Sequence, residues 1–318
     1  MTAPPRLPPL PRDPRIYQIA ALSGLLLYGM LFRGFDVTPL RAAVILIAAL
    51  ASQYACTRVW KLPVFDSKSA LISALSLCLL LRTNFAALAI LTAAVTIASK
   101  FAIRWDGKHV FNPTNFGLVA MMLATDAVWV SPGQWGSGVF FAFAIACAGL
   151  VVVQRAARAD VTFTFLGVYA ALLILRALWL GEPLAIPFHR LESGALLLFA
   201  FFMISDPKTT PDRREARILF AALVAAGAAW IHLRMFRTNG LLWSLAAFSA
   251  LVPLLDRLLP GERHAWVRGP FPVRALSKGD PREARRDWLS LHPLPARREP
   301  PDGGVLRLLR GEGGREAL

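Results

Sequence analysis

The feature that most constrains the fold is a series of long apolar runs that follow one another from Ile16 to Pro260 and are joined by short connectors. Of the 318 residues, 56% are hydrophobic and 17% are charged, and the mean hydropathy is +0.50. A soluble domain of this length typically carries about 25% charged residues. The runs therefore predict membrane-spanning helices in an all-α integral membrane protein, with the lipid bilayer as its first partner.

The apolar runs predict about ten spanning helices, which we number in chain order. A proline-rich tail at 1–15 precedes them, and a basic tail at 261–318, rich in Pro and Gly, is expected to be a mobile extension. The expected spans are Ile16–Gly34, Leu40–Trp60, Ser69–Leu81, Phe85–Arg104, Asn115–Val130, Gly138–Arg155, Val161–Leu180, Ser193–Ser205, Glu215–Leu233 and Gly240–Leu259.

Ten spans place both termini on the same side of the membrane, and the distribution of positive charge indicates which side. Fifteen Lys and Arg residues lie in the N-terminal tail and in or beside the connectors after the second, fourth, sixth and eighth spans, against six around the other connectors. Because basic connectors are retained in the cytoplasm, we expect a multi-pass protein of the cytoplasmic (inner) membrane with both termini cytoplasmic. The net charge of +15 then indicates contact with anionic lipid headgroups, and no nucleic-acid partner is expected.

The ten spans form two sets of five, at 16–130 and 138–260, with equivalent starts separated by 121 to 130 residues. Two short echoes share an offset of 124 residues: Ser69–Ile72 resembles the region of Ser193–Leu196, and Thr114–Leu118 resembles Thr238–Leu242. Because five is an odd number, the second set must run through the membrane in the opposite sense. The sequence therefore predicts two inverted five-helix repeats.

The third and eighth expected spans are unusually short and occupy equivalent places in the two sets. Ser69–Leu81 and Ser193–Ser205 have thirteen residues each, which gives about 20 Å of helix against a hydrocarbon core of about 30 Å. Paired short helices of this kind indicate a central binding site. The alternative is that both are ordinary tilted spans with polar flanks.

Polar side chains cluster in three segments near these short helices, Asp66–Ser69, Lys108–Asn115 and Asp206–Thr210. Polar groups at a membrane entrance are costly unless they are paired or bind a ligand. Asn112 precedes Pro113, so a purely structural role as a helix cap is the alternative for that residue. The candidate ligand-binding residues are Asp66, Lys68, Ser69, Lys108, His109, Asn112, Thr114, Asn115, Asp206, Lys208 and Thr209.

Signatures of metal binding and of catalysis are missing from the sequence. The three cysteines are far apart and form no CxxC pair, so no metal site is expected. The chain has no HExxH, GxSxG or glycine-rich phosphate loop, and no catalytic residue can be named.

Three segments in order, DSKSALISALSLCLLLR, ASKFAIRWDGKHVFNPTNFGLVAM and SGALLLFAFFMISDPKTTP, resemble one family of membrane subunits. The family is RnfD/NqrB, which comprises the RnfD subunit of the Rnf electron-transport complex and the NqrB subunit of the sodium-pumping NADH:quinone oxidoreductase. Its members show DGSALVTGLLL-type, GxNIFNPA and GAFFIATDPVT segments at similar spacing. The resemblance covers most of residues 60 to 260. It implies a ten-helix fold of inverted repeats, flavin binding, and electron transfer with other membrane redox subunits or a soluble electron donor.

One departure from the family bears on the cofactor. Members with covalent FMN carry it on the threonine of an SGAT motif, and this motif is missing between Pro113 and Asp206. The nearest string, Ser193–Leu196, has leucine where the threonine would stand. The resemblance therefore implies a noncovalent flavin, riboflavin or FMN, and no covalent FMN. DPRIYQIA before the first span is closer to stand-alone, UnbU-type members associated with enediyne gene clusters, for which the resemblance supplies no biochemical role.

Two functions of other classes fit the same sequence. An inverted repeat with paired short helices also suits a transporter or channel for a small solute. A non-redox assembly protein that keeps only the fold is the third reading.

Overall fold

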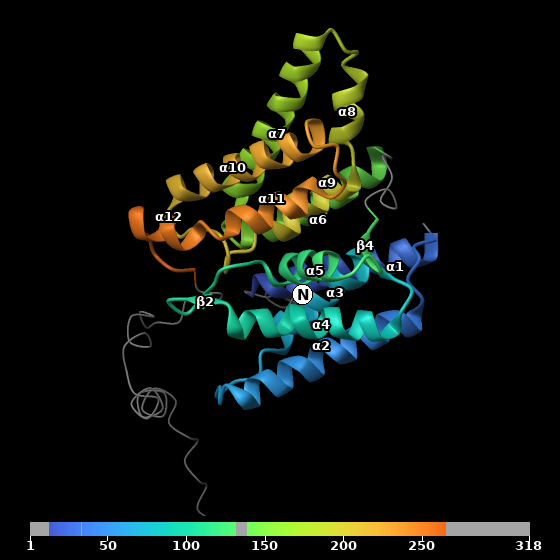
Figure 1. Ribbon diagram of the computed structural model, residues 1–318, viewed down its shortest axis with the longest axis vertical. Helices are drawn as coiled ribbons and strands as arrows, with labels where there is room; N and C mark the ends of the chain where they lie inside the picture. The colour runs from blue at the N-terminus through green and yellow to red at the C-terminus, as the bar shows by residue number, and fades with distance from the viewer. Residues whose placement is uncertain (1–12, 33, 132–138, 265–318) are drawn as a thin grey trace, which may run out of the picture. The chain divides into compact units, whose positions relative to one another are not determined.

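The computed structural model describes residues 13–32, 34–131 and 139–264, with the side chains of 139–144 left aside. The tails expected at 1–15 and 261–318 lie almost entirely outside these residues. Helices dominate the described chain (Figure 1). The first part contains α1 (Pro14–Phe32), α2 (Pro39–Val59), α3 (Ser67–Leu80), α4 (Ala86–Ala102) and α5 (Pro113–Ala124). The second contains α6 (Val139–Arg155), α7 (Ala159–Leu180), α8 (Ala185–Leu191), α9 (Gly194–Leu198), the π-helix η2 (Phe199–Met203), α10 (Arg214–Leu233), α11 (Gly240–Ser249) and α12 (Val252–Leu258).

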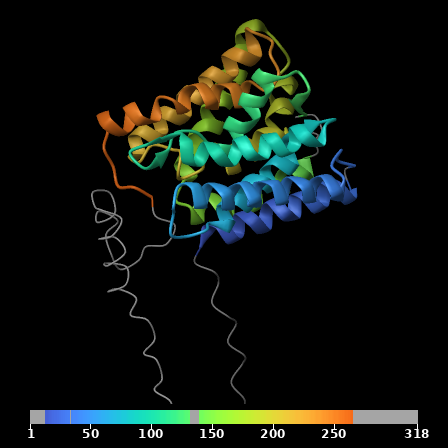
Figure 2. The same ribbon diagram turned by 60° about the horizontal axis from the view of Figure 1, so that its bottom comes forward.

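The helices of the two parts of the chain form two neighbouring groups. Helices α1 to α5 lie together, coloured blue to cyan in Figure 1, and α6 to α12, coloured green to orange, lie beside them. In the turned view of Figure 2, the blue helices of the first group lie at one side of the bundle and the orange segment of α11 and α12 lies at the other. Within the first group α2 packs on α3 and α4, and α4 packs on α5. Within the second, α10 packs on α7 and α11, while α1 with α6 and α5 with α11 connect the groups.

The described helices include several that can cross a membrane. Four are long and apolar enough by themselves: α1, α2, α7 and α10. Two more spans result if each of two bent segments is counted as one span. One joins α8 to α9 and η2, the other joins α11 to α12, and each is bent by 47° at a short break. Shorter apolar helices include α3, α4 and α5. A helical, multi-pass membrane protein agrees with the sequence prediction.

The expected spans differ from the observed helices in three places. The fifth span, expected at Asn115–Val130, ends as a helix at Ala124 and continues as an extended strand. The tenth span, expected as one helix over Gly240–Leu259, is bent between α11 and α12, where Pro253 interrupts the hydrogen-bond ladder. The eighth span, expected over Ser193–Ser205, is a short α-helix that continues as a π-helix.

Two small antiparallel β-pairs also depart from the all-α expectation. Strand β1 (Leu81–Thr83) pairs with β4 (Val128–Val130), so that the ends of α3 and α5 are joined. Strand β2 (Arg104–Trp105) pairs with β3 (Lys108–His109). Strands of two or three residues carry no detectable alternation of polar and apolar residues. β1 and β4 meet because α3 and α5 bring their ends together, whereas β2 and β3 are joined directly by the turn at Asp106–Gly107.

Small residues allow the helices to approach one another closely. Gly117 of α5 lies so near Thr96 of α4 that a Cβ at this position would overlap the threonine hydroxyl. Gly227 of α10 similarly faces Ser244 of α11, where an added Cβ would lie 2.5 Å from the hydroxyl oxygen. Close backbone approach at Gly, Ala, Ser and Thr is typical of helix packing in membranes, where shape complementarity replaces the hydrophobic effect.

Candidate functional site

One end of the helix bundle gathers polar segments that are far apart in the sequence. Asp66 is the N-cap of α3, and its side chain accepts a hydrogen bond from the backbone N–H of Ser69. The same carboxylate pairs with Arg15 at the start of α1, at 3.0 Å. Lys68 pairs with Asp13 at 2.8 Å. These ion pairs hold the beginnings of α1 and α3 together.

A tight hairpin positions two of the candidate residues, Lys108 and His109. Its turn, Asp106–Gly107, has positive φ at both residues, 51° and 78°, as a type I′ turn requires. The ammonium group of Lys108 lies 2.9 Å from Asp212 and 2.7 Å from Asp256. Lys108 therefore connects the first group of helices to Asp212, just before α10, and to Asp256 in α12.

Asn112 caps α5 and also contacts the second group of helices. Its Oδ1 accepts from the backbone N–H of Asn115 at 3.1 Å, so the predicted capping role is confirmed. Its Nδ2 donates to the carbonyl oxygen of Met203 and to Asp206, both at 3.3 Å. Asn115, fully buried, donates to the carbonyl oxygen of Leu242 at 3.1 Å. The two asparagines thus connect α5 with the segments after η2 and within α11.

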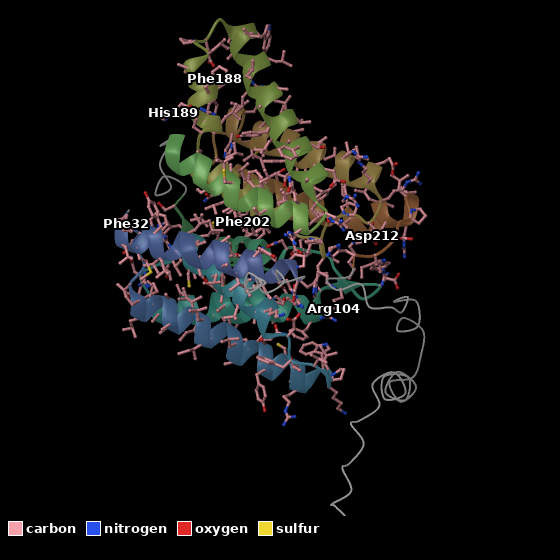
Figure 3. All side chains as sticks on the ribbon, turned by 180° about the vertical axis from the view of Figure 1, so that it is seen from behind. Phe32, Arg104, Phe188, His189, Phe202 and Asp212 are labelled. Atoms are coloured by element: carbon pink, nitrogen blue, oxygen red, sulfur yellow. The ribbon has the colours of Figure 1, made fainter. Side chains whose placement is uncertain are left out.

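A cavity of about 800 Å³ lies between the two groups of helices. At the end just described, Arg104 and Asp212 lie on the same side of the molecule, opposite to Phe32 (Figure 3). Phe202 lies between the two groups in the same view and forms part of the cavity wall together with Phe101 and Phe199. The cavity therefore combines an aromatic wall with a polar mouth.

The structure brings most of the predicted site residues to this cavity. Lys68 and Asn115 pair elsewhere, with Asp13 and the Leu242 carbonyl, and Thr209 donates to the carbonyl oxygen of Asp206. The predicted residues that line the cavity are Asp66, Ser69, Lys108, His109, Asn112, Thr114, Asp206 and Lys208.

Sequence reasoning missed Arg15, Lys100 and Arg104 as cavity-lining residues. Lys100 is 3% exposed and its ammonium group donates to the carbonyl and hydroxyl oxygens of Ser69, at 2.9 and 3.1 Å. A lysine inside an apolar run is a signal of function in a membrane helix. The signal was present in the sequence, but a lysine in the last turn of a helix, as Lys100 is in α4, can also extend its ammonium group to the membrane interface.

Burial shifts the pKa of two groups at the polar mouth. It lowers the pKa of His109 to about 3, with the neighbouring charges of Arg104, Lys100 and Lys208 adding to the effect. His109 is therefore neutral, and a neutral imidazole has one ring nitrogen that donates and one that accepts. Its Nδ1 is buried without a hydrogen-bond partner among the described residues. Burial likewise raises the pKa of Asp206, against the opposing effect of nearby cations.

The other end of the cavity contains a fixed tyrosine–histidine pair. Tyr169 Oη lies 2.8 Å from Nδ1 of His232, and the backbone N–H of Gly240 donates to Nε2 at 3.1 Å. Since Nε2 accepts this bond, the ring proton of the neutral histidine is on Nδ1 and is donated to Tyr169. The contact fixes α7, α10 and α11 relative to one another at this end, where Arg190 and Arg237 also line the cavity.

Comparison with known proteins gives one family. Residues 125–263 match the family described as "NQR2, RnfD, RnfE family". Proteins named as the D subunit of the ion-translocating oxidoreductase complex, from Escherichia coli O9:H4 (strain HS), Escherichia coli (strain K12) and Shigella boydii serotype 18, are each 34% identical to this chain over 105 residues. The aligned segment is 32% of this chain and 29% of each relative. The resemblance inferred from the sequence motifs is confirmed.

Proposed function

We propose that this chain, which resembles the NQR2, RnfD and RnfE family, is a membrane subunit of an ion-translocating oxidoreductase complex and holds a noncovalent flavin in the cavity between its two groups of helices. The family match covers the second group of helices, and the relatives are named as subunits of such a complex. The partners that follow from this proposal are other membrane redox subunits or a soluble electron donor.

The observation that carries the flavin proposal is the fit between the cavity and a flat, polar-edged ring. A volume of about 800 Å³ falls within the range of about 300–1,000 Å³ typical of small-molecule sites. Phe101, Phe199 and Phe202 supply an apolar wall. Nδ1 of His109, which has no partner among the described residues, supplies an acceptor for a hydroxyl of the flavin side chain. Asn112 and Ser73 add polar groups to the lining. A bound flavin would supply redox chemistry that these side chains lack.

The packing of the helices supports the finer proposal of two inverted repeats. In chain order α1, α2, α4 and α5 correspond to α6, α7, α10 and α11, and α3 corresponds to α9 with η2. The pairs α2–α4 and α4–α5 have counterparts in α7–α10 and α10–α11, and α1–α3 has a counterpart in α6 with α9 and η2. Between the groups, α1 packs on α6 and α5 on α11, as a two-fold axis through matching helices would require.

Side-chain contacts support a topology of about ten spans with both termini in the cytoplasm. Segments predicted to lie at the cytoplasmic side contact one another: Arg217 in the first turn of α10 pairs with Asp160 in the first turn of α7 at 2.7 Å, and Arg263 pairs with Asp106 at 2.8 Å. Helices α3 and α5 would cross only part of the bilayer, and their extended ends, β1 and β4, pair with each other. Such pairing satisfies backbone groups that lipid cannot.

Absorption spectroscopy of the detergent-purified protein tests the flavin proposal. We expect flavin bands in the near ultraviolet and blue, and complete release of the flavin by acid or denaturant, because no SGAT threonine is present to hold it covalently. The variant His109→Ala should lose most of the flavin, while Arg213→Ala, an exposed residue of the same end that does not line the cavity, should keep it. Colourless wild-type protein that takes up no added flavin would contradict the proposal. Fluorescence retained on the band of a denaturing gel would contradict noncovalent attachment.

One observation favours a second function, a transporter or channel for a small solute. The cavity is lined at one end by Arg15 and Lys108 and at the other by Arg237 and Asn239, so the same space reaches both ends of the bundle. Colourless protein that mediates solute flux in liposomes would support this function. Protein with neither flavin nor flux would leave the non-redox assembly role.

A further inference from the structure

The polar mouth of the cavity carries more positive than negative charge. Three of the cationic side chains that line it are neutralised by carboxylates within 3.0 Å. Arg15 pairs with Asp13 and Asp66, Lys108 with Asp212 and Asp256, and Arg263 with Asp106.

Three further cations of the mouth, Lys100, Arg104 and Lys208, have no carboxylate at ion-pair distance within the described part of the chain. Lys100 is buried and bonds only to oxygen atoms of Ser69. The guanidinium of Arg104 donates to the carbonyl oxygen of Lys100 and lies 5.3 Å from the centre of the Phe101 ring. Lys208 is half-buried. The three side chains therefore differ in solvent exposure: Arg104 is exposed, Lys208 is half-buried and Lys100 is buried.

These three cations line the cavity together with His109. Lys100, Arg104 and Lys208 are the charged groups that act on its imidazole. His109 is neutral and therefore adds no compensating charge, while its buried Nδ1 lacks a partner among the described residues. Cationic groups with little access to water are costly unless an anion neutralises them.

Asp66, which is paired with Arg15, and Asp206 are the carboxylates that act on Lys100 and Lys208. Asp206 forms no ion pair within the described part of the chain. It already accepts from Asn112 Nδ2 at 3.3 Å and from the backbone N–H of Lys208 at 3.0 Å. Lys100, Lys208 and Arg158 all lie close enough to act on its charge. The carboxylates near these cations therefore have other partners, and an anionic group such as a phosphate monoester could neutralise the cations.

We propose that Lys100, Arg104 and Lys208 form an anion site at the mouth of the cavity, which binds the phosphate group of a phosphorylated ligand. Arg104 presents the planar fork that matches phosphate oxygens, and the two lysines act as point charges. This inference rests on the proposed function where it names the ligand: the bound flavin is the 5′-phosphate and not riboflavin. The anion site itself does not depend on the flavin.

Titration of the detergent-purified full chain, stripped of flavin, with riboflavin and with its 5′-phosphate tests this site through the quenching of flavin fluorescence. We expect the phosphate to bind at least about tenfold more tightly than riboflavin, because riboflavin leaves the cations unpaired. Lys208→Gln and Arg104→Gln should each abolish most of this difference while leaving riboflavin binding within about twofold. Arg213→Gln, at an exposed position of the same end, is the matched control and should change neither affinity.

The effect of inorganic phosphate on the unfolding temperature tests the anion site independently of the flavin proposal. Phosphate should raise the unfolding temperature of the wild type and of Arg213→Gln, and not that of Lys208→Gln or Arg104→Gln. If neither flavin binds but phosphate stabilises in this pattern, the anion site is supported and the proposed function is wrong. If both flavins bind equally, or if the variants respond to phosphate like the wild type, the anion site is wrong. Repeating the phosphate titration in nanodiscs of neutral and of anionic lipid shows the source of the group: stabilisation by anionic lipid alone would assign it to a lipid headgroup.

Because Lys100 is buried, the ligand affinities of a Lys100 variant are compared with those of the wild type only after the variant is shown to fold. Lys100→Met should be monodisperse by size-exclusion chromatography before its affinities are compared. The two more exposed positions, Arg104 and Lys208, decide the proposal if this variant does not fold.

Discussion

At the scale of single residues, the polar mouth depends on Lys108 as the ion-pair partner of two carboxylates. The side chains of Lys108, Asp212 and Asp256 are 11%, 8% and 20% exposed. Asp256 also accepts a hydrogen bond from the backbone N–H of Asp212 at 2.8 Å. Burial raises the pKa of Asp212, and the bond from Lys108 opposes that effect. Removing the ammonium group would leave two neighbouring carboxylates with little water.

The variant Lys108→Met should destabilise the protein by about 3–5 kcal/mol, because breaking a buried ion pair leaves uncompensated charge. Thermal unfolding of the detergent-purified protein measures the loss. Arg213→Met removes an exposed pair with Glu215, 48% and 64% exposed, and should cost less than about 1 kcal/mol. Adding Asp212→Asn to Lys108→Met should restore part of the stability. Equal losses in the two single variants would show that Lys108 has no special role.

At the scale of helices, packing between α4 and α5 depends on the lack of a side chain at Gly117. The residue faces Thr96, and both are buried in the interface. The hydroxyl of Thr96 lacks a hydrogen-bond partner among the described residues. Since α5 carries Asn112 at its beginning, any displacement of α5 also moves the polar mouth of the cavity.

Gly117→Val should destabilise the protein by about 1–3 kcal/mol, since the added atoms must push the helices apart. It should also weaken ligand binding through the displaced α5. Gly167→Val in α7 is the matched control, because nothing lies within 4 Å of a Cβ at that position and the residue is exposed. The unfolding temperature and the monodisperse fraction measure both variants. A control as unstable as Gly117→Val would indicate an effect of helix propensity and not of packing.

At the scale of the whole molecule, the proposed topology separates the polar mouth from the Tyr169–His232 end by the thickness of the membrane. Single cysteines in a background without the three native cysteines can be labelled with a membrane-impermeant maleimide in intact cells. Asp126→Cys and Pro183→Cys should be labelled from outside. Glu215→Cys and Glu262→Cys should react only after the membrane is permeabilised. All four positions are exposed, so labelling of Glu262→Cys in intact cells would contradict the ten-span topology.

The sequence by itself determined the features that depend on neighbouring residues. Apolar runs located most of the helices to within a few residues, as for α2, expected at Leu40–Trp60 and observed at Pro39–Val59. The Asn112–Pro113 cap was predictable because capping is a contact within one turn. The Asp106–Gly107 turn was equally local and could have been predicted from its residue types. The family resemblance came from short motifs in order, while the ten spans and the inverted repeat remain predictions.

Only the tertiary structure decided which polar groups meet and which stay unpaired. Lys108 lies 104 residues from Asp212 and 148 from Asp256 in the sequence, and no local pattern connects them. Lys100 resembled a lysine at a helix end until α3 was found beside it, with Ser69 as its hydrogen-bond partner. The irregular helix after α9 also depends on distant segments, because Thr162 of α7 and Asn112 donate hydrogen bonds to the carbonyl oxygens of Ala200 and Met203. Local signals determine where helices begin and end, but the balance of charge at a site is a sum over distant segments, so it is decided only when they pack.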